Sequence, residues 1–189
     1  MQLSKVLKST KDYNLDLTAG WLYQHIENST EVAGVLGNDR TITISMPSLS
    51  LGYAAKNYDK YGGRNFASFT LKGNFAGKFG ASDSATFSNQ NPDARGQFWL
   101  SSLHLARFQK FFKGEQEPGK WSMFMEFEAQ AADDSLVSAV QYRLGGASTV
   151  RGYEEGEIVG DTGYRGVLEL RTPIIDNFIP GLKHAEDFL

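Results

Sequence analysis

The sequence contains no cysteine, and this absence excludes disulfide bonds, thiol catalysis and cysteine-ligated zinc or iron–sulfur sites within its 189 residues. It also lacks the roughly 18 consecutive apolar residues that a membrane-spanning helix needs, and its mean hydropathy is −0.36. Positive charge is scarce too, since 19 Lys and Arg stand against 22 Asp and Glu without any basic stripe. A helical membrane protein and a nucleic-acid-binding protein are therefore both disfavoured.

Sequence signals for enzymatic chemistry are also missing. The sequence has no Walker loop, no dinucleotide-binding glycine pattern and no G-x-S-x-G motif. His25, His104 and His184 are isolated along the chain, without the spacing of a metal-binding pair. Glu126 and Glu128 share one face of an expected strand, and we interpret them as lining carboxylates rather than as a catalytic pair. We therefore predict a protein that is not an enzyme and that uses no metal, cofactor or nucleotide.

What the sequence does contain is strong alternation with a period of two. Residues 13–24, 66–79 and 121–131 alternate in this way, which places successive side chains on opposite faces of a β-strand. Each run is longer than the typical soluble strand of about five or six residues. Weaker strands are expected at residues 41–55, 98–112, 137–144 and 164–171.

Polar stretches rich in glycine and asparagine separate these strands. We expect loops at residues 28–40, 58–65, 81–97 and 113–120, and no helix of convincing length. Within residues 41–55 the apolar face switches near Met46 and Pro47, which a β-bulge or an edge strand would allow. Long loops alternate with shorter links, as in outer-membrane barrels, although a Greek-key sandwich also mixes loop lengths.

The alternation by itself fits two folds, because the apolar face is the core of a soluble β-sandwich and the lipid-facing side of a membrane barrel. The long strands, and aromatic residues near strand ends such as Trp21 and Trp99, favour an all-β, antiparallel transmembrane β-barrel. On this interpretation Glu126 and Glu128 face the lumen. The residues that alternate with them and face lipid are Trp121, Met123, Met125 and Phe127.

Four motifs near the C-terminus are more specific. In order, they are Leu144-Gly145-Gly146, Val150-Arg151-Gly152-Tyr153, Gly160-Asp161-x-Gly163 and Leu168-Glu169-Leu170-Arg171, followed by Pro173. Together they resemble the two-partner secretion transporters of the haemolysin secretion/activation (ShlB/FhaC/HecB) family, within the superfamily of BamA-like and bacterial surface antigen proteins. The resemblance is closest from Trp121 onward.

This resemblance implies a sixteen-stranded barrel in the bacterial outer membrane, preceded by periplasmic POTRA domains that capture the exported substrate. The chain offers only seven or eight strand candidates, no POTRA-like pattern, and no signal peptide in residues 1–16. We therefore expect residues 1–189 to be a partial outer-membrane β-barrel domain. The implied function is export of a large partner exoprotein, in contact with outer-membrane lipid and without nucleotide or nucleic acid.

The resemblance also implies that the loop of residues 150–153 folds back into the lumen, where Arg151 pairs with an inward-facing carboxylate. Alternation along the next strand places Glu169 inward if Leu168 and Leu170 face lipid. The resemblance implies that Glu169 is one partner of Arg151, and the pairing is physically sensible because a guanidinium in a confined lumen needs a carboxylate.

The accompanying motif of Gly160, Asp161 and Gly163 is expected to form a loop or turn, in which Asp161 either caps the turn or contacts the loop. Two other functions stay open. One is a BamA-like outer-membrane protein insertase, and the other, from a different class, is a soluble β-sandwich that binds carbohydrate. We also expect that these strands alone do not close into a barrel, since both terminal strands would present open edges.

Overall fold

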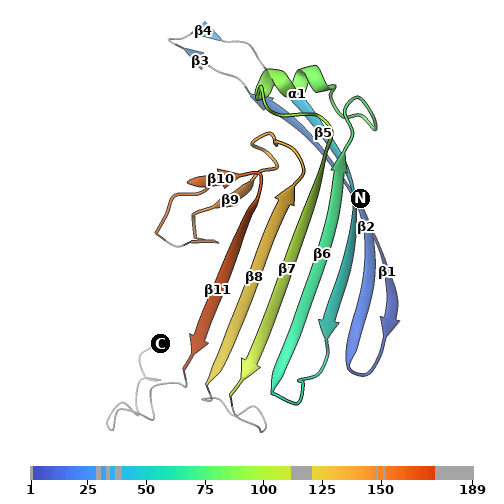
Figure 1. The fold of residues 1–189 in the computed structure, drawn as a ribbon, viewed down its shortest axis with the longest axis vertical. Coiled ribbons are helices and arrows are strands. Elements are labelled where there is room, and N and C mark those ends of the chain that lie inside the picture. Colours follow the sequence, from blue (N-terminus) through green and yellow to red (C-terminus); the bar gives the residue numbers. More distant parts are fainter. Residues whose placement is uncertain are drawn as a thin grey trace, which may run out of the picture.

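The computed structural model describes residues 2–28, 31–32, 35–36, 40–111, 121–147, 149–150 and 152–172, and the structural statements below concern these residues. Seven strands form one sheet in which neighbouring strands are antiparallel (Figure 1). In sheet order they are β1 (Gln2–Ser9), β2 (Tyr13–Asn28), β5 (Arg40–Ala55), β6 (Gly63–Asn74), β7 (Phe98–Lys110), β8 (Ser122–Ala132) and β11 (Gly163–Arg171). The loops carry β3 (Glu31–Val32) paired with β4 (Val35–Leu36), the helix α1 (Ser84–Gln90), and β9 (Tyr142–Leu144) paired with β10 (Ile158–Gly160).

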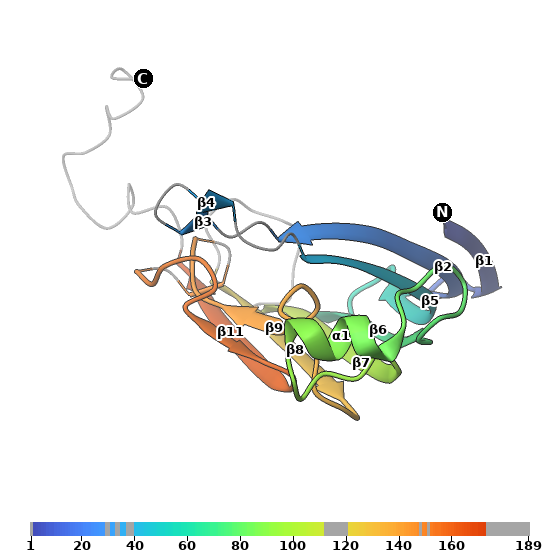
Figure 2. The same ribbon diagram turned by 90° about the horizontal axis from the view of Figure 1, so that it is seen from above.

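The main sheet is curved and open (Figure 2). β1 and β11 lie at its two edges and are not paired with each other. The expected all-β antiparallel fold with seven or eight strands is confirmed, and so is the expectation that these strands do not close. The β-sandwich alternative is wrong for the described residues, because they form no second large sheet packed face to face on the first. The described part of the chain contains no helix that could cross a lipid bilayer.

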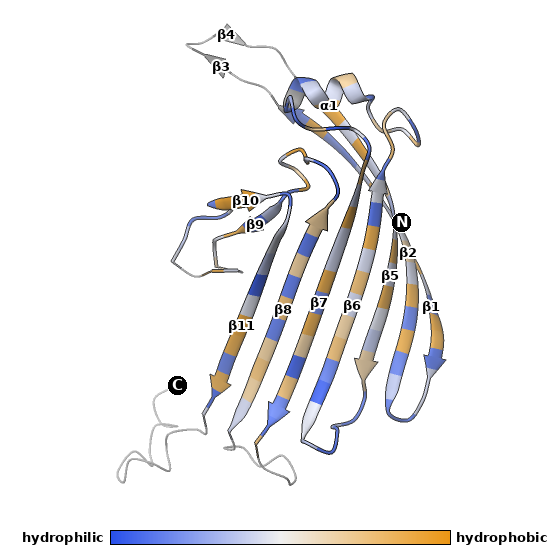
Figure 3. Ribbon diagram, in the orientation of Figure 1, coloured by the Kyte–Doolittle hydropathy of each residue, from blue (hydrophilic) through white to orange (hydrophobic). Residues whose placement is uncertain are grey.

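The cross-strand register gives the sheet two chemically different faces, and hydrophobic and hydrophilic residues alternate along its strands in Figure 3. Directly paired residues point to the same side, so alternating strands collect apolar side chains on one face and polar ones on the other. The outer face, as we call it, carries the exposed side chains of Leu49, Leu51, Phe69, Leu71, Leu105, Phe127, Leu168 and Leu170. The inner face carries Ser50, Thr70, Ser102, His104, Glu126, Glu128, Gln130, Arg165 and Glu169. Glu126 and Glu128 thus point to the inner face, whereas Met123, Met125 and Phe127 of the same strand point to the outer face, as the alternation predicts.

The inner face changes character at the end of the sheet where the long loops lie. There α1 and the segment of residues 133–141 cover it, and Phe87 and Leu136 are fully buried against apolar residues of β5 and β7. This cover explains the switch of the apolar face near Met46. The predicted bulge is wrong, because β2 and β5 pair without interruption from Tyr13↔Ala55 to Asn28↔Arg40. The edge alternative fits, because β6 pairs only with Ser48–Ala54 of β5 and, within the described part of the chain, leaves residues 40–47 without a strand on that side. The large apolar side chains that face inward on β5, Ile42, Ile44 and Met46, are those that α1 and its neighbours cover.

Some element boundaries differ from the prediction. The predicted strand at residues 137–144 contributes only β9, which pairs with β10 outside the main sheet. The strand at residues 66–79 ends at Asn74, and a turn follows. β1 and α1 were not predicted. α1 begins at an N-cap, where the Asp83 carboxylate accepts a hydrogen bond of 2.9 Å from the Thr86 backbone N–H, and the Thr86 hydrogen bonds lower the pKa of that carboxyl.

The turn after β6 builds an aromatic cluster at the long-loop end. Phe79 contacts Trp21 and Phe75, and Phe75 contacts Trp99, all edge to face with ring centroids 5.4–5.9 Å apart. Trp21 and Trp99 are also partly exposed, at 41% and 43%. This arrangement suits a membrane–water interface, where aromatic rings with one apolar and one wet side are enriched.

The two faces generate the first prediction, which compares neighbouring residues at the same depth in β6. Phe69→Arg places a charge at the centre of the outer face and should lower the free energy of unfolding by about 2–4 kcal/mol if that face meets lipid. Ser68→Arg places the same charge on the inner face and should cost much less. Urea unfolding of the complete barrel in lipid vesicles measures both values. Equal losses for the two variants would contradict the assignment of the faces.

Candidate functional site

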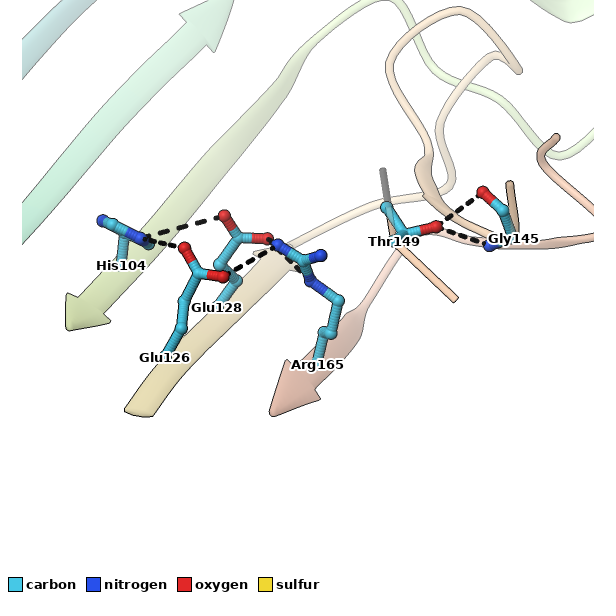
Figure 4. A network of polar contacts seen from close by, with 6 residues as sticks. All are labelled: His104, Glu126, Glu128, Gly145, Thr149 and Arg165. Carbon is cyan, nitrogen blue, oxygen red and sulfur yellow. Dashed lines mark hydrogen bonds and ion pairs between the residues drawn. The ribbon is translucent and has the colours of Figure 1, made fainter. Parts of the chain in front are cut away.

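The loop between β8 and β11 carries the motifs that the sequence analysis singled out. Its base is the β9–β10 hairpin, in which Tyr142 pairs with Gly160 and Leu144 with Ile158. Beyond this hairpin, Gly145 donates from its backbone N–H to the Thr149 hydroxyl at 2.8 Å, and that hydroxyl donates to the Gly145 carbonyl oxygen (Figure 4). The hairpin is therefore closed by a local hydrogen-bonded turn.

Val150, Gly152 and Tyr153 of the second motif lie beyond this hairpin. Gly146 and Val150 form a β-bridge, and the Gly146 backbone N–H donates to the Tyr153 carbonyl at 3.0 Å. Gly146 and Gly152 have φ values of 91° and 94°, which residues with a Cβ rarely adopt. Val150 and Tyr153 are exposed. Arg151 lies outside the described residues, so its role stays a prediction.

Asp161 contacts two residues of the segment between β8 and β9, and its contact with the motif around Arg151 stays a prediction. Its Oδ1 accepts hydrogen bonds of 3.0 Å from the Leu136 backbone N–H and from the Gln141 side-chain amide. The carboxylate thus ties both ends of the loop together, just after β10 ends at Gly160 and before β11 begins at Gly163.

Next to the loop base, four charged or titratable side chains form a ladder across the inner face (Figure 4). His104 of β7, Glu128 of β8 and Arg165 of β11 are directly paired in register, and Glu126 lies two residues from Glu128. The His104 Nε2 is 2.8 Å from Glu126 Oε1 and 4.0 Å from Glu128 Oε1. We call these four residues the charged ladder.

Arg165 connects both carboxylates of the charged ladder. Its Nη2 lies 2.7 Å from Glu128 Oε2 and 3.4 Å from Glu126 Oε2, and its Nε donates to Glu128 at 3.1 Å. Only 13% of the Arg165 side chain is exposed, so the guanidinium is held where water screens little. Nε and Nη2 both donate to the same oxygen of Glu128, and hydrogen bonds between two charged groups are stronger than neutral ones. The charged ladder therefore links β7, β8 and β11.

The donor set of the charged ladder also resembles a metal site. Within the described residues, His104, Glu126 and Glu128 bring one ligand atom each within 4.8 Å of one another. Arg165, however, already bonds one oxygen of each carboxylate. The geometry fits a salt-bridged connection between strands. Sequence reasoning treated His104 as isolated, because its partners are 22 and 24 residues away and only the cross-strand register brings them together.

Glu169 lies further along β11 on the inner face, in register with Phe124. Its neighbours Leu168 and Leu170 are 70% and 57% exposed on the outer face. The Glu169 Oε2 is 3.3 Å from Arg171 Nη2, and both side chains are largely open to solvent. Its pairing with Arg151 stays a prediction.

Comparison with known proteins adds two similarities. A family model described as haemolysin secretion/activation protein ShlB/FhaC/HecB matches residues 2–186. Among solved structures, CdiB from Escherichia coli is similar, with a TM-score of 0.69 and 22% sequence identity. That likeness shows the fold alone, and it covers 89% of this chain but only 29% of CdiB. A comparison with curated proteins finds no significant match.

The charged ladder generates the second prediction. Arg165→Met leaves two partly buried carboxylates without their guanidinium and should lower the free energy of unfolding by about 1.5–3 kcal/mol. Arg95→Met is the matched control, because the Arg95 side chain is 77% exposed and lies 3.4 Å from Asp134. An exposed pair contributes at most about 1 kcal/mol. Urea unfolding in vesicles gives both values, and an Arg165 effect no larger than that of Arg95 would refute the role of the charged ladder.

Proposed function

Because this chain belongs to the haemolysin secretion/activation (ShlB/FhaC/HecB) family, whose members reside in the bacterial outer membrane, we propose that it forms part of the wall of a barrel that exports a partner exoprotein. The observation that carries this proposal is the family match over residues 2–186. The protein acts as a translocator and not as an enzyme.

The two faces of the sheet support this role. The apolar outer face suits contact with lipid, and the polar inner face suits a water-filled passage for an extended polypeptide. In a bilayer every backbone N–H and C=O must find a partner within the protein. The two open edges, β1 and β11, are therefore positions where further strands of a complete barrel would pair.

The loop between β8 and β11 acts in this proposal as a lock inside the passage. The β9–β10 hairpin and its turn lie beside the upper part of β11 in Figure 1. Glu169 lies on the inner face six residues beyond Gly163, or about 20 Å along the strand at about 3.3 Å per residue. Within the described part of the chain Glu169 contacts Arg171 at 3.3 Å, and its carboxylate is accessible, so it can accept a further donor such as Arg151.

Secretion of the partner exoprotein tests the function. The complete transporter, expressed in cells that make the exoprotein, should release that protein into the medium, and deletion of residues 144–158 should abolish or deregulate its release. Levels of unrelated outer-membrane barrels should not change. A general loss of those barrels, with no specific effect on the exoprotein, would instead favour the insertase alternative.

The Arg151–Glu169 pair provides the third prediction. Arg151→Ala and Glu169→Ala should each impair secretion, since either change leaves a charge without its partner in a confined passage. The double variant should be less impaired than the sum of the two, because the interaction can be lost only once. Secretion assays on the two single variants and the double variant complete this double-mutant cycle. Strictly additive effects, or normal secretion by Arg151→Ala, would show that Arg151 does not pair with Glu169.

A further inference from the structure

The base of the loop rests on the inner wall through Tyr142. Tyr142, the first residue of β9, lies directly against Gly163, the first residue of β11. A Cβ placed on Gly163 would lie 2.3 Å from Tyr142 Cδ1 and 3.0 Å from Cε1, far closer than van der Waals contact allows. The absence of a side chain at Gly163 is what lets the ring approach the wall.

Residues of β8 and β11 on both sides of this contact also bind the loop base. The guanidinium of Arg165 lies close to the Tyr142 side chain, and the charged ladder holds that guanidinium in place. Gln130, in register with Gly163 on β8, donates from its side-chain amide to the Val140 carbonyl at 3.1 Å. Ring packing, a charged donor and an amide therefore converge on the residues around Tyr142.

We propose that Tyr142, Gly163 and Arg165 form a seat that holds the loop base on the wall independently of Arg151. The seat makes Arg165 a positioning residue for the lock. Release of the loop tip then lets the hairpin beyond Leu144 move while its base stays fixed. This inference rests on the proposed function, because it specifies how the same loop is held during export.

The glycine offers a sharp test with a matched control on the same strand. Neither Gly163 nor Gly166 has a positive φ, so the backbone accepts alanine at both positions. At Gly166 the nearest atom to an added Cβ is the Glu126 carbonyl oxygen at 4.0 Å, whereas at Gly163 the Tyr142 ring must move. Gly163→Ala should therefore displace the loop base, and Gly166→Ala should leave it in place.

The measurement is single-channel conductance of the complete transporter in planar lipid bilayers, with heat-modifiable migration on gels as the check that the barrel has folded. Gly163→Ala should raise the conductance or the time spent open while the barrel stays folded, and Gly166→Ala should match the unchanged protein. A folded Gly163→Ala barrel with unchanged conductance would overturn the seat.

A second set of variants tests the seat if Gly163→Ala fails to fold. Tyr142→Ala should open the pore, and Tyr142→Phe should have a smaller effect, because it keeps the ring and loses only the contact with Arg165. In the Tyr142→Ala background, Gly163→Ala should add nothing, since the clash has been removed. Normal conductance in Tyr142→Ala, or additive effects in the double variant, would overturn the proposal.

The outcomes also separate the seat from the lock. If Arg151→Ala leaves secretion unchanged while Tyr142→Ala opens the pore, the lock fails and the seat stands. If Arg151→Ala impairs secretion while Tyr142→Ala changes nothing, the seat fails and the lock stands.

Discussion

The rest of the structure depends on the unbroken antiparallel register that runs from β2 to β11. Pairing satisfies the backbone of each strand, which a bilayer cannot do, and it also decides the face of every side chain. A slip of one residue in β8 would turn Glu126 and Glu128 toward the outer face. Only the observed register brings His104, Glu128 and Arg165 into line across three strands. The charged ladder therefore forms only in this register, and its ion pairs favour this register in turn.

In the proposed lock, the same register explains how the base of the loop stays on the wall while the hairpin beyond Leu144 moves. Its base lies over β8 and β11, where Gln130 and Gly163 are paired and Arg165 follows two residues later. The contacts there combine packing with charge and reach the wall directly. Beyond Leu144 the turn depends on hydrogen bonds within the hairpin itself, such as those between Gly145 and Thr149. Local bonds of this kind can move as a unit, because none of them ties the hairpin to the sheet.

Alternation predicted the central strands and their faces because the period of two is a direct consequence of strand geometry. It missed β1, whose side chains are all exposed and whose sequence carries little alternation. It missed the charged ladder for a different reason. His104 and Glu126 are 22 residues apart, and no local spacing predicts which residues face each other across strands. The seat could not be predicted from the sequence either, because a glycine in a motif shows that space is needed but does not show which ring fills that space.

The switch of the apolar face on β5 is also informative about the inner face. On β5 the inward residues near Met46 are apolar because α1 and the neighbouring loop cover them, whereas Ser48 and Ser50 further along are polar and open. An exported polypeptide with exposed apolar segments would adhere to an uncovered apolar lining. In the proposed passage, covering the buried cluster around Ile42, Ile44 and Met46 removes one such apolar surface at the long-loop end. Further along the sheet the inner face mixes Phe66, Phe108 and Phe124 with the charged ladder and the serines, so the loops cover the continuous apolar cluster and leave a mixed surface on the rest of the wall.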